Sequence, residues 1–229
     1  MTDPGGWHGE IGYFDASGAR TGRELFSLSR HGDGSRTLRA QCEMDDDDLV
    51  RDSLLMLAPD GKPSEAYVRI VEAGTPLGSG WYRFAGGEVE AHVLEPGCPP
   101  VLQSIRLPDE ILFFGSHALA NDAWLARLAE TLPKGSSARL DNLVTCSLQA
   151  NGGGVPAIHV TAARIEYVGD TEVEVAPGNL PCRHYRVGYG DYPPLDMWVT
   201  GPERILVRMT WGHLAGRYEL LALSEDLRG

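Results

Sequence analysis

The clearest fold signal in the sequence is Ala163-Arg-Ile-Glu-Tyr-Val-Gly-Asp-Thr-Glu-Val-Glu-Val-Ala-Pro-Gly178. Its β-branched and aromatic residues favour strands, and the Pro-Gly pair at its end favours a turn. Three further segments of the same character follow at residues 182–187, 195–200 and 205–211. Because this region leaves little room for a helix, the sequence predicts an antiparallel meander that wraps around a central body.

The first hundred residues repeat this pattern. Residues 24–30 and 36–42 flank the Gly-rich connection His31-Gly-Asp-Gly-Ser35, which is typical of a β-hairpin. Segments with strand character continue at residues 51–57, 65–71, 78–84 and 88–94. We therefore expect five or six successive antiparallel strands before the middle of the chain.

A single helix is expected between the two strand-rich halves, at about residues 115–132. Apolar residues recur at helical spacing from Leu119 to Leu132, and Asn121 or Asp122 can cap the first turn. Pro133 ends the pattern. The layout is therefore a meander, a central helix and a second meander.

These elements define a mainly β fold, an antiparallel barrel or half-barrel meander of the lipocalin kind with one central α-helix. The length of 229 residues fits one large β domain. Residues 1–22 are rich in Gly, Asp and Ser, so we expect them to form an irregular lead-in to a domain over residues 23–229.

Composition excludes several classes of protein. A formal charge of -12 would repel a phosphate backbone, so nucleic acid is not expected as a partner. The sequence shows neither a secretory signal nor eighteen consecutive apolar residues, and we expect a cytoplasmic chain without membrane insertion. The 4 cysteines form no C-x-x-C pair and are expected as free thiols. A homodimer is compatible with the sequence.

The C-terminal third also resembles a known family. The motifs are Tyr167-Val-Gly169, Val173-Glu-Val-Ala-Pro-Gly178, Cys182-Arg-His-Tyr185 and Trp198-Val-Thr200. They are similar to the C-terminal portion of the DUF3108-type proteins of unknown function. The resemblance implies a curved antiparallel sheet or partial barrel with an apolar interior, similar to lipoprotein carriers and lipocalins, and it implies no reaction.

His117 and Asp122 are the first candidate site residues. They lie just before or within the first turn of the expected helix. If the helix closes the mouth of a barrel, His117 is placed to exchange a proton with a bound ligand and Asp122 to orient or charge it. The structural alternative is a helix cap preceded by a loop histidine.

The segment Gly78-Ser-Gly-Trp-Tyr-Arg-Phe84 carries further candidates. Tyr82 could donate a hydrogen bond to a carbonyl or enolate oxygen, and Arg83 could bind a carboxylate. The alternative is an aromatic ladder across strands with a surface arginine. Arg51 is a candidate ligand anchor, and the remaining candidates for the ligand-binding wall are Trp81, Trp124 and Tyr67.

No metal or cofactor is expected. The run Asp45-Asp-Asp-Asp48 lacks the spaced ligands of a calcium loop and is interpreted as a solvated turn. Nucleotide-binding glycine motifs and the serine nucleophile elbow are missing from the sequence. We expect a hydrophobic small molecule in a β-barrel cavity, bound by a cofactor-independent lyase, isomerase or hydratase. The alternatives are a non-catalytic carrier and a structural interaction module.

Overall fold

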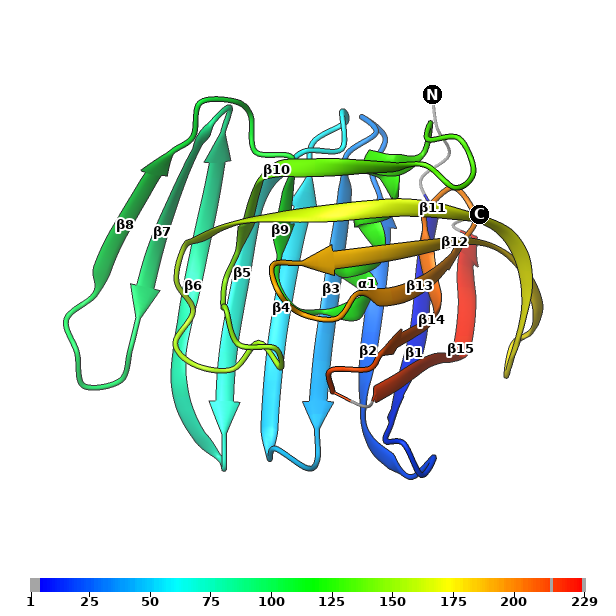
Figure 1. Ribbon diagram of the computed structural model, residues 1–229. Coiled ribbons are helices and arrows are strands. Elements are labelled where there is room, and N and C mark those ends of the chain that lie inside the picture. The colour runs from blue at the N-terminus through cyan, green and yellow to red at the C-terminus, as the bar shows by residue number, and fades with distance from the viewer. Residues whose placement is uncertain (1–4, 215, 228–229) are drawn as a thin grey trace.

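The computed structural model describes residues 5–214 and 216–227, which form a 15-stranded sheet and one short helical segment (Figure 1). The first half supplies β1 (Gly5–Phe14), β2 (Arg20–Arg30), β3 (Arg36–Met44), β4 (Leu49–Leu57), β5 (Pro63–Glu72), β6 (Thr75–Ala85), β7 (Glu88–Leu94) and β8 (Val101–Arg106). The second supplies β9 (Phe113–Gly115), β10 (Ser137–Thr145), β11 (His159–Val175), β12 (Gly178–Tyr189), β13 (Leu195–Thr200), β14 (Ile205–Trp211) and β15 (Gly216–Leu227). No helix within these described residues is long and apolar enough to cross a membrane.

The sheet is an open meander. Its order is β8-β7-β6-β5-β4-β3-β2-β1-β15-β14-β13-β12-β11-β10-β9, so the first and last strands of the chain pair in the interior of the sheet. The neighbours are antiparallel except for β9 and β10. In Figure 1, β10 to β13 cross in front of the first half, with the helical segment between the two layers. This arrangement confirms the predicted mainly β meander with one helix.

The expected irregular lead-in over residues 1–22 is wrong for residues 5–14, which form a strand that pairs with both β2 and β15. Residues 1–4 of the expected lead-in lie outside the described residues. Glycines obscure the strand pattern here. A Cβ atom on Gly9 would lie 2.4 Å from the ring of Phe26, and one on Gly12 would lie 2.7 Å from Leu221. The glycines leave room for side chains of neighbouring strands, so the segment has few strand-favouring residues of its own.

The helix is shorter than residues 115–132. It consists of α1 (Leu119–Asp122) and the 3₁₀ segment η1 (Ala123–Ala129). Neither Asn121 nor Asp122 caps it, since the N-cap residue is Ala118 and no side chain of the cap position bonds to the helix. The carboxylate of Glu24, in β2, accepts hydrogen bonds from the backbone N–H groups of Leu119 and Ala120 instead. A distant strand therefore supplies the cap.

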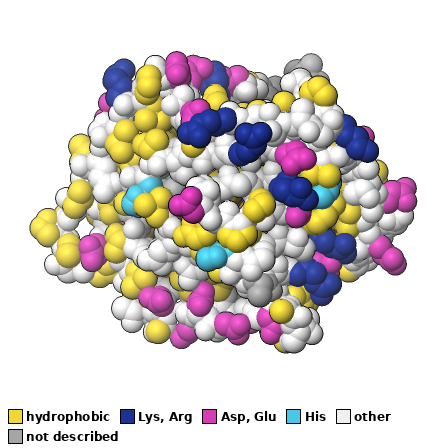
Figure 2. All heavy atoms as spheres, in the orientation of Figure 1, with side chains coloured by type: hydrophobic (Ala, Val, Ile, Leu, Met, Phe, Trp, Pro, Cys, Tyr) yellow, Lys and Arg dark blue, Asp and Glu magenta, His cyan; other side chains and the backbone are white. Residues whose placement is uncertain are grey.

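The core follows from the alternation of side chains along the strands. In β5, Val68 and Ile70 are buried while Tyr67 and Arg69 are exposed, which resolves a segment whose two faces look similar in sequence. The space-filling view shows charged side chains of both signs scattered among apolar ones on the face of Figure 1 (Figure 2). Apolar side chains of both halves meet in one main core, between the layers.

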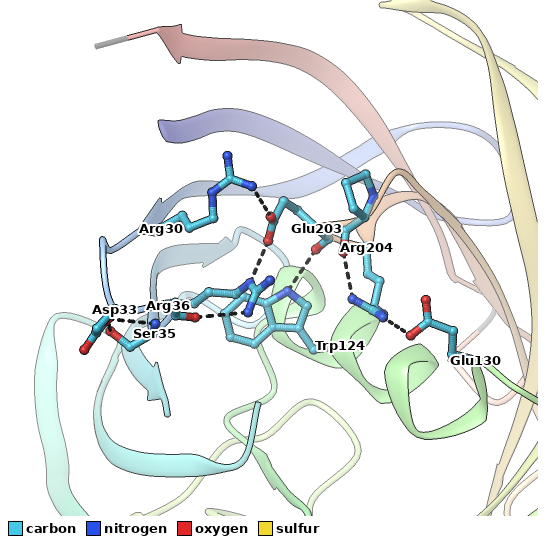
Figure 3. A network of polar contacts seen from close by, with 10 residues as sticks. Arg30, Asp33, Ser35, Arg36, Trp124, Glu130, Glu203 and Arg204 are labelled. Carbon is cyan, nitrogen blue, oxygen red and sulfur yellow. Dashed lines mark hydrogen bonds and ion pairs between the residues drawn. The ribbon is translucent and has the colours of Figure 1, made fainter. Parts of the chain in front are cut away.

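A polar network joins the two halves around the buried side chain of Glu203 (Figure 3). Its carboxylate accepts from Arg36 Nε at 2.7 Å and from Arg30 at 3.3 Å. Its backbone oxygen accepts from Trp124 Nε1 at 3.1 Å. The helical segment, the β2–β3 hairpin and the turn before β14 are thereby held together.

Candidate functional site

A cavity of about 400 Å³ lies between the two halves of the sheet. Most of its lining is apolar or aromatic and comes from both halves, including Tyr13, Leu143 and Met209. Exposed residues such as Tyr192 and Asp47 lie at its opening, whereas Arg51 belongs to its buried wall. Among the predicted site residues, Arg51, His117 and Asp122 line this cavity.

Arg51 is 1% exposed and points into the interior. Its guanidinium donates one hydrogen bond to the backbone oxygen of His117 at 2.7 Å and another to that of Asn151. No ion pair joins Arg51 to a carboxylate within the described part of the chain, and its Nε lacks a hydrogen-bond partner there. The positive charge is therefore held by backbone dipoles.

His117 sits in the left-handed backbone region, with φ of 58°. Its Nε2 lies 3.0 Å from the backbone oxygen of Ser147 and 3.1 Å from Thr145 Oγ1. Because a carbonyl oxygen only accepts, Nε2 carries the proton and Nδ1 carries the lone pair. Burial, reinforced by the charge of Arg51, lowers the pKa of His117 to about 4. The imidazole is consequently neutral at physiological pH.

The pKa of Asp122 is shifted upward, opposite to that of His117. Burial and, to a smaller extent, the nearby Glu24 carboxylate raise the pKa of Asp122 to about 7, against the opposing effect of Arg51. Its side chain has no hydrogen-bond partner among the described residues. Neither a hydrogen bond nor an ion pair joins it to His117, although both line the same cavity. The two side chains thus line the same cavity without a hydrogen bond or ion pair between them.

Glu24 is a buried charged position that the sequence interpretation missed. It is 0% exposed and accepts hydrogen bonds from Leu119 N at 2.7 Å, Ala120 N at 2.8 Å and Tyr13 Oη at 3.1 Å. The thiol of Cys42 adds a fourth contact at 3.4 Å. Burial raises the pKa of Glu24, while these donors oppose the rise. The sequence signal for its burial is that Glu24 shares a strand face with the apolar Phe26 and Leu28.

Tyr82 and Trp124 lie outside the cavity lining. Tyr82 is 0% exposed, donates to the backbone oxygen of Ala157 at 3.1 Å and packs on the ring of Phe114 at 4.6 Å. Trp124 belongs to η1, is buried, and donates to the backbone oxygen of Glu203. Both have structural contacts that account for their burial.

The remaining predicted residues lie on the outer face of the sheet. Tyr67 and Trp81 are each 37% exposed and directly opposite one another on β5 and β6. Trp81 also faces His92, with ring centroids 5.6 Å apart, and donates to Glu65 at 2.8 Å. Arg83 is exposed on the same face. This is the cross-strand ladder given above as the alternative for the segment.

The cysteines at positions 42, 98, 146 and 182 are free. Burial raises the pKa of Cys146 to about 12, so its thiol stays protonated at neutral pH. Within the described ranges, no three His, Cys, Asp or Glu side chains gather closely enough to hold a metal ion.

No protein-family model matches the chain, and no curated protein matches it in sequence. Among solved structures, it is similar to a β-barrel-like protein of the domain of unknown function DUF1849 from Brucella abortus. The TM-score is 0.60, the identity 12%, and the match covers 98% of both chains. A DUF1089 family protein from Pseudomonas aeruginosa aligns with a TM-score of 0.49 and 12% identity over 83% of this chain and 90% of that one. A putative exported protein of YmcC-like fold from Bacteroides fragilis aligns with a TM-score of 0.33 and 9% identity over 97% and 96%. The likeness to the DUF1849 protein shows the fold alone, which is that of a β-barrel-like sheet protein.

Proposed function

We propose that this protein binds a hydrophobic small molecule in the cavity between its two meanders. The observation that carries the proposal is an interior space of about 400 Å³ walled mainly by apolar and aromatic side chains. Ligand pockets in proteins have this size and this combination of apolar walls with a few polar groups. Open and closed β-barrels that side chains do not fill are a common place for such pockets.

The polar groups of the wall orient the ligand. Arg51 belongs to β4 in the first half of the sheet, and Asp122 belongs to α1. Both line the cavity. The local resemblance of residues 167–200 to DUF3108-type proteins supports the same view, because it implies a curved sheet with an apolar interior.

Acid–base chemistry on the bound molecule is a second candidate function. Its support is the pKa of about 7 for Asp122, which suits a group that takes and returns protons near neutral pH. Asp122 would take a proton from one carbon of the ligand and return it to another, so an isomerisation balances without a co-reactant. Neutral His117 supplies a lone pair in the same space.

Cavity filling tests the binding function. Thr161, on β11 opposite Leu143, lines the cavity, whereas the neighbouring Val160 is 47% exposed. We expect wild-type protein to be stabilised against heat by hydrophobic small molecules, Thr161→Trp to lose this effect, and the matched control Val160→Trp to keep it. Absence of any ligand-dependent shift in the wild type would favour the interaction module instead.

Turnover of a ligand found in this way tests the second candidate. Asp122→Asn preserves shape and removes the carboxylate, so it should abolish turnover even at ligand concentrations that saturate the variant. Tyr82→Phe is the control, because Tyr82 lies outside the cavity lining.

A further inference from the structure

The charges of the cavity wall are unevenly distributed. Its carboxylates belong to Asp15, Asp46, Asp47 and Asp122, and its single guanidinium belongs to Arg51. Arg51 already donates to two backbone oxygens. The buried Glu24 lies on the same sheet face, because Glu24 pairs with Cys42 and Cys42 pairs with Arg51. The cavity is therefore negative in sum, within a protein of formal charge -12.

Asp122 stands apart from the other carboxylates. Asp15 accepts from Ser17 and Ala19 in its own turn, and Asp47 accepts from Asn151 Nδ2 at 3.0 Å. Asp122 has no such partner among the described residues, although burial raises its pKa strongly. The Asp122 side chain is only partly buried and lines the cavity, so its carboxylate can accept a hydrogen bond from a bound ligand.

Aromatic rings surround the same space. Tyr189 lies close enough for the Asp122 charge to raise its pKa, in addition to the larger effect of burial. Trp211 and Tyr192 pack edge to face with ring centroids 5.7 Å apart at the opening, and Tyr218 lies on the same wall. The faces of Trp and Tyr rings attract cations, and they attract them more strongly where water is excluded.

These groups together match one ligand chemistry. An anionic head group would meet a wall with a surplus of carboxylates, and a neutral ligand would carry no charge to balance the Asp122 carboxylate. A protonated amine would donate to Asp122 and contact the aromatic rings. We propose that the ligand is an apolar molecule that carries a protonated amine, bound with the amine at Asp122; this inference rests on the binding function proposed above.

The test compares three ligands with one skeleton: 4-phenylbutylamine, 4-phenyl-1-butanol and 4-phenylbutanoate. Affinities are measured by calorimetry at pH 8 with wild-type protein. The amine should bind about tenfold more tightly than the alcohol, which is the size of effect expected for one charge-assisted hydrogen bond. The carboxylate should bind most weakly, and Thr161→Trp should remove the binding of the amine.

Asp122→Asn provides the second arm. It should weaken the amine about tenfold and leave the alcohol unchanged, which also shows that the variant is folded. Asp48→Asn removes the same charge from a residue outside the cavity lining and should change neither affinity. Equal binding of amine and alcohol to wild type, or preference for the carboxylate, overturns the amine inference but leaves the binding function standing. Binding of none of the three overturns both.

Discussion

Glu24 and Arg51 are opposite buried charges in one cross-strand row, two strands apart and separated by Cys42. At the spacing of strands in a sheet, their Cα atoms are about 10 Å apart. Glu24 accepts from the backbone of Leu119 and Ala120, and Arg51 donates to the backbone of His117. Glu24 thus binds backbone N–H groups and Arg51 binds a backbone carbonyl group of the short segment 117–120. Together they fix the position of His117 and of the start of the helix.

Neutralising Glu24 should weaken the fold. In Glu24→Gln, an amide replaces one acceptor oxygen and faces backbone N–H groups with donors of its own. It also removes the negative charge that shares a cross-strand row with Arg51. We expect a loss of about 2 to 4 kcal/mol in the free energy of unfolding, measured with urea. Glu43→Gln, at a partly exposed ion pair with Arg23, is the control and should cost less than about 1 kcal/mol. A similar loss in both variants would contradict the role given to Glu24.

Arg51→Met should also destabilise the protein, by about 3 kcal/mol, because two backbone oxygens lose their donor and Glu24 keeps an uncompensated charge. If the two residues act together, the double variant with Glu24→Gln should be more stable than the sum of the single losses predicts. Urea unfolding of the four proteins gives this coupling energy. Simple additivity would show that the charges act independently.

Asp122→Asn should change the dependence of stability on pH. The folded-state pKa of about 7 lies above the ordinary value of 3.8, so the folded protein binds this proton more tightly than the unfolded chain does. The contribution is fully present below pH 4 and is lost as the pH rises to about 7. The variant should therefore equal wild type near pH 4 and exceed it at pH 8, by on the order of 3 kcal/mol. Glu24, Arg51 and Tyr189 act on Asp122 in this range and are common to both proteins. A stability difference that stays constant from pH 4 to 8 would refute the shift.

Glu203→Gln tests the network between the two halves of the sheet. The variant weakens contacts to both Arg30 and Arg36, and we expect it to lose about 1 to 3 kcal/mol in stability because the carboxylate is buried. Glu130→Gln serves as the control, since the Glu130 side chain is 57% exposed in its pair with Arg204. Thermal unfolding of both variants is the measurement. If Glu203→Gln and Glu130→Gln melt at the same temperature, the network around Glu203 contributes little to stability.

Local sequence patterns predicted much of the fold. The hairpin of residues 24–42 and the strands after residue 163 carry their own signals in alternation and in turn residues. The strand at residues 5–14 does not, because its glycines are required by the Phe26 and Leu221 side chains that pack over them. The helix cap also lacks a local signal, because the capping residue is Glu24, which is 95 residues away from Leu119 in sequence.

The candidate site was predictable only in part. Arg51, His117 and Asp122 are ionisable groups beside apolar segments, and they do line the cavity. Trp81 and Arg83 differ from Tyr82 only in the strand face that they occupy, and a shift of one residue in register exchanges the faces. Glu24 was overlooked because its role depends on the helix that packs against β2, which no local pattern of β2 reveals.

The pairing of β1 with β15 has a consequence for how the chain folds. Gly5 lies opposite Leu227, so the interior of the sheet is completed by contacts that span nearly the entire sequence. Such contacts require a large loop to close before they contribute any stability, and proteins rich in them fold slowly. We expect each meander to acquire order by its own short turns first, with the seam between β1 and β15 closing as a late, rate-limiting step.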